Sequence, residues 1–297
     1  MKALIFDGTL HLEQIPAPEP VQGEVLVKIR TSAICNTDLE IIRGYMGFKG
    51  VPGHEFVGEV VSTDSPLAGR RVTGEINCSC GECYLCKTLR PTHCSERSVT
   101  GIFNHQGVFA DYIVLPEKNL HTVPDHVPDE HAVFTEPLAA AVEILEEIHI
   151  PPGRKVFIFG AGKLGLLISL VFKCYGADFT VFDIHPEKVA KAREIGISAE
   201  LAGSLSQHDK AEICVDCTGS PDGIALAMEH LWPRGTLVLK TTVASPGKLD
   251  LNQIVINELK ILASRCGPFP PPIRLLSNRL IAPAPLISGI FEFEHIM

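Results

Sequence analysis

The chain has 297 residues and a formal net charge of −9, with hydrophobic residues at 45% and charged residues at 21% of the total. This ordinary globular composition excludes a disordered or collagen-like chain, and the length suits about two domains. The negative charge disfavours nucleic acid or an anionic membrane as the main partner. No apolar run approaches the about 20 residues that span a bilayer, and Asp7 interrupts any secretory signal core at the N-terminus. We therefore expect a cytoplasmic protein that binds neither nucleic acid nor membrane.

Short predicted strands separated by turns fill the first third of the chain. The segments 25–30 and 55–61 are rich in β-branched residues, and a third strand is expected at 109–114. Proline- and glycine-rich stretches such as Pro52-Gly53 mark the connections. The pattern predicts a β-rich domain whose loops carry most of the cysteines and histidines.

From about residue 140, apolar segments typical of buried strands alternate with helical segments. The predicted strands are 155–159, 179–182, 212–216, 236–240 and 259–263. The predicted helices are 163–175, 186–195 and 221–231. This alternation indicates an α/β domain with a parallel sheet that helices cover on both faces. After Gly267 the chain becomes proline-rich and the alternation stops.

A glycine motif follows the first of these strands and opens a predicted helix: Gly160-Ala161-Gly162-Lys163-Leu164-Gly165. That context is what a dinucleotide-binding Gly-x-Gly-x-x-Gly motif requires. The first glycine allows the tight turn, the second lets the backbone approach a pyrophosphate, and the third lets helix and strand pack closely. The free amides at the start of the helix, around Lys163 and Leu164, would hold the phosphates.

Asp183 stands at the end of the second predicted strand of this domain. An acid there can accept hydrogen bonds from the adenosine ribose and would repel a 2′-phosphate, which favours NAD over NADP. The residues that follow, Ile184-His185-Pro186, supply no Lys or Arg for a 2′-phosphate. The alternative role for Asp183 is an N-terminal acid for the helix at 186–195, and the two roles are compatible.

Four of the ten cysteines have the spacing C-x2-C-x2-C-x7-C: Cys80, Cys83, Cys86 and Cys94. In a reducing cytosol such clustered cysteines indicate metal ligands rather than disulfides. Four thiolates complete a tetrahedral shell around zinc and leave no position for a substrate, so we expect a structural site. Iron–sulfur ligation is the competing interpretation, although nothing else in the sequence suggests one-electron chemistry.

A second set of metal-binding residues lies in two loops. Cys35-Asn36-Thr37-Asp38 follows one predicted strand, and Gly53-His54-Glu55 precedes another. A cysteine, a histidine and one or two carboxylates can hold zinc and leave one position open for a substrate oxygen. Taken singly each residue is weak evidence, because a lone histidine or cysteine is more often a packed structural residue.

Several motifs occur in a fixed order over nearly the whole chain. They are Gly23-Glu24-Val25-Leu26-Val27, Cys35-x-Thr37-Asp38, Gly53-His54-Glu55-x-x-Gly58, the four-cysteine segment, Gly107-x-Phe109-Ala110-Asp111-Tyr112, Glu136-Pro137-Leu138 and the glycine motif. In these motifs the sequence resembles the zinc-containing medium-chain dehydrogenases, the family of alcohol, sorbitol and threonine dehydrogenases. The resemblance implies a GroES-like, β-rich catalytic domain at 1–140, completed by 267–297. It also implies an inserted Rossmann domain, a doubly wound parallel sheet, at 141–266.

The resemblance implies a role for each residue of the second set. Cys35 and His54 become ligands of a catalytic zinc, and Asp38 orients His54 through its other ring nitrogen. Glu136 takes the place of a third cysteine, as in polyol dehydrogenases, and Glu55 is a companion carboxylate that exchanges with water or substrate at the metal. Which of the two glutamates ligates zinc in the resting state stays open.

The implied reaction transfers a hydride between an alcohol and NAD, with ketone or aldehyde as the other partner. Thr37 accepts the hydroxyl proton, but Glu40 occupies the position where liver-type enzymes place a proton-relaying histidine. A glutamate at position 136, as in polyol dehydrogenases, suits a secondary alcohol, a polyol or a hydroxy amino acid as substrate. Two alternatives are a zinc-independent quinone or enoyl reductase of the same superfamily and a non-catalytic NAD(H)-sensing protein.

The resemblance also bears on assembly and on the C-terminus. Members of the family form dimers or tetramers, and their dimers join through the last strands of the Rossmann domain, here near 260–263. Family members run on for a few tens of residues past the end of this sequence. We therefore expect this chain either to be a truncated form or to complete its catalytic domain with less.

Overall fold

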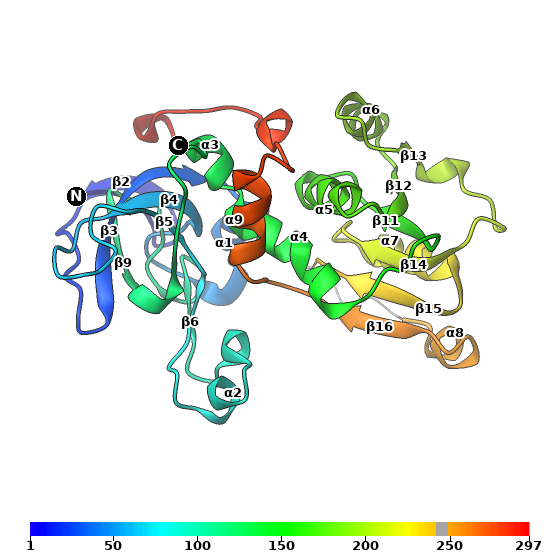
Figure 1. The fold of residues 1–297 in the computed structure, drawn as a ribbon, viewed down its shortest axis with the longest axis horizontal. Coiled ribbons are helices and arrows are strands. Elements are labelled where there is room, and N and C mark those ends of the chain that lie inside the picture. The colour runs from blue at the N-terminus through cyan, green and yellow to red at the C-terminus, as the bar shows by residue number, and fades with distance from the viewer. Residues whose placement is uncertain (242–248, 297) are drawn as a thin grey trace. The chain divides into compact units, whose positions relative to one another are not determined.

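The computed structural model describes residues 1–241 and 249–296. The chain forms two compact units, unit 1 with Met1–Glu136 and Pro268–Met297, and unit 2 with Pro137–Gly267 (Figure 1). Unit 2 is therefore inserted in the sequence of unit 1. No helix among the described residues is long and apolar enough to cross a membrane.

A five-stranded antiparallel sheet forms the core of unit 1, with the strand order β10-β5-β4-β3-β9. Its strands are β3 (Glu24–Ala33), β4 (Glu55–Val60), β5 (Arg71–Gly74), β9 (Tyr112–Pro116) and β10 (Leu120–Thr122). Alternate side chains point into the core, as the pleat requires. Val25 is 3% exposed, and Val27 and Leu115 are fully buried.

The third predicted strand begins later than expected. The prediction was 109–114, whereas β9 starts at Tyr112. The preceding residues pair instead with β1 (Lys2–Phe6), because the Leu4 N–H donates to the Phe109 carbonyl at 2.8 Å and Ala3 faces Ala110. β1 also pairs with β2 (Leu10–Gln14). This segment therefore connects the N-terminal hairpin to the sheet.

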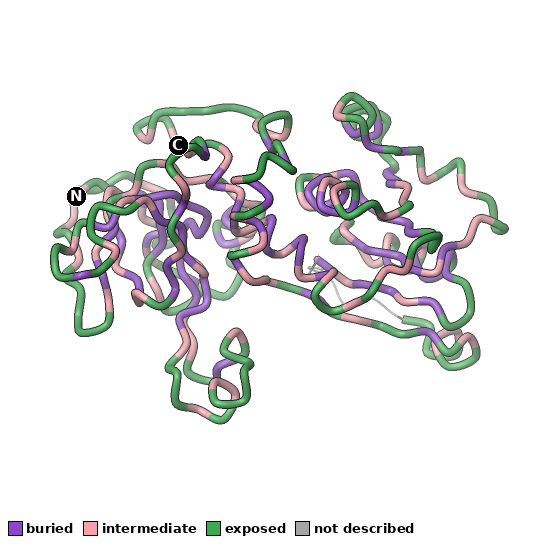
Figure 2. Tube along the Cα trace, viewed as in Figure 1, coloured by how far each residue is buried: buried purple, intermediate pink, exposed green. Residues whose placement is uncertain are grey.

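Short elements complete unit 1. Its helices are α1 (Asn36–Ile42), α3 (Asp129–Ala132) and α9 (Pro270–Ser277), with 3-10 turns at Tyr45–Gly47, Glu117–Asn119, Ala284–Leu286 and Phe293–His295. The four-cysteine segment contains β6 (Asn77–Cys78), α2 (Tyr84–Lys87), a 3-10 turn at Pro91–His93, β7 (Ser98–Thr100) and β8 (Asn104–His105). Figure 1 shows the α2 region projecting from the sheet, and Figure 2 shows how little of it is buried. Within 79–97, Cys94 is the one buried residue.

Unit 2 contains a six-stranded parallel sheet in the order β13-β12-β11-β14-β15-β16, as the predicted α/β class requires. The strands are β11 (Lys155–Phe159), β12 (Asp178–Asp183), β13 (Ala199–Leu201), β14 (Ala211–Asp216), β15 (Leu231–Leu239) and β16 (Lys260–Ala263). The helices are α5 (Lys163–Cys174), α6 (Pro186–Glu194), α7 (Pro221–Glu229) and α8 (Leu251–Ile256), with a 3-10 turn at Ala202–Ser204. The strand order reverses between β11 and β14, and ligands of such sheets bind outside the carboxyl ends of the strands at that point.

Among the helices that lie where the sequence predicts none, α4 and α9 are the longest. α4 (Thr135–Glu147) begins with the last residues of the first part of unit 1 and continues into unit 2. α9 begins with three prolines, which the first turn of a helix accepts because its amides need no helical partner. Leu275 and Leu276 of α9 are buried.

Candidate active site and metal centres

The end of β3 and the start of α1 place Cys35 and Asp38 together. Cys35 is the residue before α1, and its backbone N–H donates to Asp38 Oδ2 at 2.8 Å. The other carboxylate oxygen, Asp38 Oδ1, lies 3.2 Å from His54 Nδ1. Asp38 is 2% exposed, so its negative charge is held almost entirely by these two partners. One buried acid thus holds both the Cys35 backbone and the His54 imidazole.

His54 and Glu55 lie where the chain enters β4. Gly53 precedes them with φ +94°, and a Cβ there would lie 2.7 Å from the Phe109 ring, so the turn that delivers His54 requires glycine. Burial alone would lower the pKa of His54, but its hydrogen bonds to Asp38 and Cys35 outweigh burial and raise it. The surroundings of the imidazole therefore favour a positive charge at this place, either a proton on the ring or a cation next to it.

The ligand atoms of Cys35, His54 and Glu55 all lie within 4.8 Å of one another. Glu136, from the first turn of α4, lies close enough to act on Glu55: burial, together with the charges of Glu136 and Asp38, raises the pKa of Glu55 to about 8. A thiolate, an imidazole and carboxylates form a donor set that zinc accepts, and a divalent cation would offset the buried negative charge. The residues therefore fit a zinc ion.

The four-cysteine segment has the geometry of a closed metal site. The sulfur–sulfur distances are 3.4 Å for Cys80–Cys94, 3.5 Å for Cys83–Cys86, 3.7 Å for Cys83–Cys94 and 4.0 Å for Cys80–Cys86. A ZnS₄ tetrahedron with Zn–S bonds of about 2.3 Å has edges of ~3.8 Å, so these distances suit zinc. Backbone N–H groups lower the pKa of Cys80, and that of Cys83 to about 6, which favours thiolates at these two positions. Burial and the neighbouring thiols raise the pKa of Cys86 to about 11, so a metal ion would have to displace that proton.

The glycine motif joins β11 to α5 as predicted from its spacing. Gly160 has φ +103°, and a Cβ on Gly165 would lie 1.9 Å from the Gly160 carbonyl oxygen, so helix and strand approach too closely for any side chain. Around Gly162 nothing lies within 4 Å of a built Cβ, which leaves space against the backbone at the helix start. Lys163 and Leu164 form the first turn, and no side chain caps it at Gly162. These amides can serve an anion.

Asp183 ends β12 beside this motif. Its Oδ2 accepts the Ala161 N–H at 2.8 Å and its Oδ1 accepts the His185 N–H at 2.9 Å, so the carboxylate is oriented by the glycine loop itself. Lys188 Nζ lies 3.8 Å from Asp183 Oδ2. The sequence analysis did not single out Lys188, because a lysine on an exposed helix face is commonplace. Its distance from Asp183 only becomes visible when α6 is placed on the sheet.

Two further residues singled out from the sequence lie on α1, which begins directly after Cys35. Thr37 Oγ1 lies 3.6 Å from Cys35 Sγ. Glu40 lies on the same helix, α1, and forms an ion pair with Arg43 at 2.7 Å. The structure thus gathers Cys35, Thr37, Asp38, His54 and Glu55 in one place.

One unit with two cysteine-containing groups that could hold a metal and another with a dinucleotide motif on a parallel sheet are the parts of a metal-dependent dehydrogenase. Family models agree with this class. An alcohol dehydrogenase GroES-like domain matches residues 21–125, and a zinc-binding dehydrogenase domain matches residues 164–278.

Several dehydrogenases and related proteins are similar to this protein over most or all of its length. The starvation-sensing protein RspB of Escherichia coli K12 is 32% identical over all of this chain and 93% of the relative. The crystal structure of rspB from E. coli CFT073, called a short chain alcohol dehydrogenase and complexed with NADH, is 30% identical, with a TM-score of 0.93, over 100% of this chain and 93% of that one. The L-threonine 3-dehydrogenase of a Chelativorans species is 31% identical over 88% of this chain and 82% of the relative. Galactitol-1-phosphate dehydrogenase of E. coli is 27% identical, with a TM-score of 0.88, over 97% of this chain and 92% of that one. The chain therefore belongs to the zinc-containing medium-chain dehydrogenases, a family of NAD(P)-dependent alcohol oxidoreductases.

Proposed function

We propose that this protein interconverts a small secondary alcohol and its ketone with NAD as the hydride acceptor. The observation that carries the proposal is the buried group of Cys35, His54 and Glu55, whose ligand atoms lie within 4.8 Å of one another, with Thr37 beside it. The substrate class is an alcohol with further polar groups, a polyol or a hydroxy amino acid. This choice draws on Glu136, on the threonine dehydrogenase and on the galactitol-1-phosphate dehydrogenase among the relatives.

Cys35, His54 and Glu136 would hold the catalytic zinc, with Glu55 as the companion carboxylate. When bound, zinc supplies Lewis-acid chemistry, which lowers the pKa of a hydroxyl in contact with it. Asp38 holds the His54 ring by its Nδ1 and so leaves the other ring nitrogen for the metal. Cys35, His54 and Glu55 are buried or half-buried, which strengthens their electrostatic action on a substrate.

Proton transfer falls to Thr37. Its hydroxyl lies 3.6 Å from Cys35 Sγ, where it can accept the proton of a substrate hydroxyl while donating its own onward. Glu40 is held by Arg43 at 2.7 Å, which ties up the carboxylate at the position of the family's relay histidine. Proton exit in this protein therefore does not depend on a histidine at that position.

NAD binding falls to the glycine motif and Asp183. Gly160, Gly162 and Gly165 shape the loop, the first-turn amides of Lys163 and Leu164 meet the pyrophosphate, and Asp183 accepts the ribose hydroxyls. The negative charge of Asp183 makes NADP the poorer cofactor. Cys80, Cys83, Cys86 and Cys94 would hold a second, structural zinc. We place the protein in the cytoplasm, where thiolates stay reduced, as a homodimer or homotetramer.

The proposal is tested by metal analysis and a substrate screen on the Cys35→Ala variant. We expect two zinc ions per wild-type chain and one per variant chain, with turnover lost and NADH binding retained. The screen covers polyols, aldoses, threonine and simple alcohols with NAD and NADP. Activity that survives the substitution would point to a zinc-independent reductase. A single zinc and no turnover in the wild type would point to a non-catalytic NAD(H)-binding protein.

A further inference from the structure

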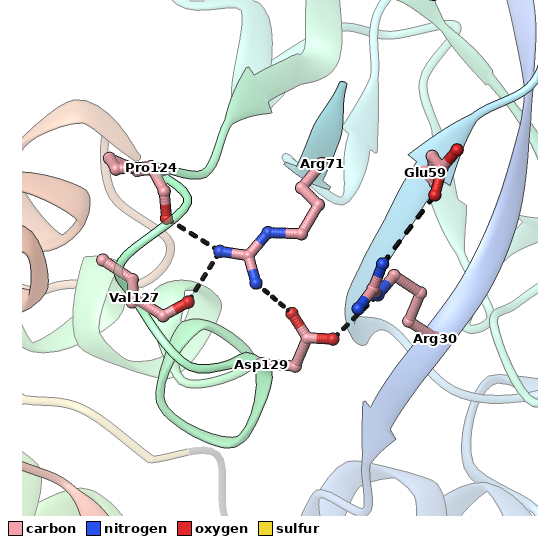
Figure 3. A network of polar contacts seen from close by, with 6 residues as sticks. All are labelled: Arg30, Glu59, Arg71, Pro124, Val127 and Asp129. Carbon is pink, nitrogen blue, oxygen red and sulfur yellow. Dashed lines mark hydrogen bonds and ion pairs between the residues drawn. The ribbon is translucent and has the colours of Figure 1, made fainter. Parts of the chain in front are cut away.

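A partly buried ionic network ties the segment before Glu136 to the sheet of unit 1 (Figure 3). Arg71, on β5, donates from Nη1 to Asp129 Oδ1 at 2.6 Å. Its Nη2 donates to the carbonyl oxygens of Pro124 and Val127 at 2.7 and 2.6 Å. One guanidinium thus fixes three points of the segment that leads into α3, and its fork geometry makes that contact directional.

The other oxygen of Asp129 is also held. Arg30, on β3, donates from Nε to Asp129 Oδ2 at 2.8 Å, and its Nη1 lies 3.8 Å from Glu59 of β4. The side chains of Arg71 and Asp129 are 15% and 18% exposed, so this pair is less screened by solvent than a surface pair. Two strands, β3 and β5, therefore hold the Asp129 carboxylate through their arginines, and Glu59 of β4 pairs with Arg30.

Hydrogen bonds within the segment from Asp129 to Thr135 brace the chain just before Glu136. Asp129 is the first residue of α3, and its carbonyl accepts the Val133 N–H at 3.0 Å. The Thr135 hydroxyl then donates to the Ala132 carbonyl at 2.7 Å, and Thr135 is fully buried. Glu136 follows directly in the first turn of α4. Few backbone torsions between Asp129 and Glu136 can change without breaking one of these hydrogen bonds.

The same strands deliver the other metal-binding residues. Cys35 follows the end of β3, and Glu55 begins β4, with Ala33 paired to Glu55 across the ladder. Arg30 lies earlier on β3 and Glu59 later on β4. The network thus connects the segment bearing Glu136 to the two strands that present Cys35 and Glu55.

We infer that Arg71, Arg30 and Asp129 are positioning residues that set where the Glu136 carboxylate stands relative to Cys35 and His54. Glu136 is far from Cys35 and His54 in the sequence, so local structure alone cannot fix its position relative to them. The network supplies the missing constraint. This inference rests on the proposed function insofar as that function makes Glu136 a metal ligand.

The test measures metal affinity at the catalytic site of the full-length holoprotein. Zinc is exchanged for Co²⁺, and a competing chelator is titrated while the Co²⁺ absorption is followed, since a one-thiolate site and a four-thiolate site absorb differently. The variants are Asp129→Asn, Glu136→Gln, and the two together. Asp7→Asn is the matched control, because Asp7 is an exposed aspartate of unit 1 that accepts hydrogen bonds from Thr9.

We expect Asp129→Asn to weaken metal binding at the Cys35 site by about 10–100-fold, the usual effect of losing a residue that orients ligands. The four-cysteine site should keep its metal, and Asp7→Asn should match the wild type. In the Glu136→Gln background, adding Asp129→Asn should cost less than ~3-fold, because the path through Glu136 is already cut. The same full loss in both backgrounds would overturn the inference.

The design separates this inference from the proposed function. Unchanged metal affinity in Glu136→Gln alone would refute the ligand role of Glu136, and with it the basis of the network's role. Weakened binding in Glu136→Gln with none in Asp129→Asn would refute the network's role only. If Asp129→Asn loses metal from the four-cysteine site too, it has unfolded. Arg30→Gln, which alters the more exposed side of the network, then takes its place under the same criteria.

Discussion

At the residue scale, the glycine motif shows that three identical residues can be required for different reasons. A Cβ on Gly165 would lie 1.9 Å from the Gly160 carbonyl oxygen, which is backbone and cannot move aside cheaply. Gly162 has φ −76°, an ordinary value, and nothing within 4 Å of a built Cβ. Glycine is therefore needed at position 165 for packing of the helix against the loop, and at position 162 only to leave space for a bound cofactor.

A pair of alanine variants separates the two requirements. Gly165→Ala should lower stability by about 1–3 kcal/mol, the cost of overpacking. Gly162→Ala should cost less than about 1 kcal/mol, because glycine is only a moderately better residue before a helix. We expect Gly162→Ala nonetheless to raise the Kd for NADH at least ~10-fold, because its methyl group enters the pyrophosphate space. Calorimetric unfolding and NADH titration measure the two effects. NADH binding of Gly162→Ala equal to wild type would show that the cofactor does not pass over this residue.

Residues of the candidate site differ in how far the sequence predicts them. The four cysteines are recoverable from spacing, because all their ligand atoms come from one short segment. Asp38 of α1 and His54, just before β4, come from separate segments, and only the family resemblance indicates that pair. The Arg71–Asp129 contact had no signal at all, because an ion pair between distant segments leaves no local pattern in the sequence.

At the element scale, α4 carries unfavourable negative charge near its C-terminal end. Its last turns carry three acids, Glu143, Glu146 and Glu147, at the end where the helix dipole disfavours negative charge. Lys240 donates from Nζ to the Ala140 carbonyl at 2.6 Å and so holds the helix against β15. Burial and the neighbouring charge of Glu147 still raise the pKa of Glu143 to about 7, against the lowering effect of Lys240.

This raised pKa gives the stability of the protein a pH dependence. An acid with a higher pKa in the folded state stabilises the fold fully below its unfolded pKa, near 4.5, and that contribution is lost as pH rises through about 7. We therefore expect Glu143→Gln to be more stable than wild type at pH 8 by on the order of 1 kcal/mol, with the gain vanishing toward pH 5. Thermal unfolding from pH 5 to 8 measures it. Glu229→Gln, a change at an exposed acid of α7 in the same unit, is the control. A pH-independent difference would contradict the assignment.

Unit 2 shows which elements are predictable. Its parallel strands are buried on both faces, so they appear as continuous apolar segments, and the predicted strands at 155–159 and 212–216 overlap β11 and β14. In unit 1, the sequence does not predict α9, because three prolines usually end regular structure, whereas here they occupy the first turn of a helix, where no helical amide donor is needed. The sequence does not predict α4 either, because Glu136-Pro137 in its first turn has the pattern of a ligand motif and not of a helix.

At the scale of the whole molecule, each unit has its own core and its own ligands. The core of unit 1 centres on residues such as Val27, Phe56 and Leu115, and that of unit 2 on residues such as Phe157 and Leu237. The metal-binding residues lie in unit 1 and the glycine motif in unit 2. Ligand binding should therefore stabilise the two units separately.

Calorimetry of the full-length protein tests this separation. Saturation with NADH at about 100 times its Kd should stabilise the transition of unit 2 by ~2.7 kcal/mol. Removal of zinc by a strong chelator should lower the transition of unit 1 and leave that of unit 2 in place. Gly162→Ala should lose the NADH effect but keep the chelator effect. A single transition that both treatments shift equally would show that the units unfold together.

The continuity of α4 also matters for anyone who builds chimeras from this protein. An exchange of nucleotide-binding units between relatives is naturally planned at the border between Glu136 and Pro137, where the compact units divide. That border cuts the first turn of a helix that starts at Thr135. A graft joined there would replace the helix that presents Glu136 with one from the donor. A graft joined before Thr135 would bring the whole helix from the donor, including the donor's own residue at position 136. The junction that keeps the helix and its acid together therefore lies two residues before the border between the compact units.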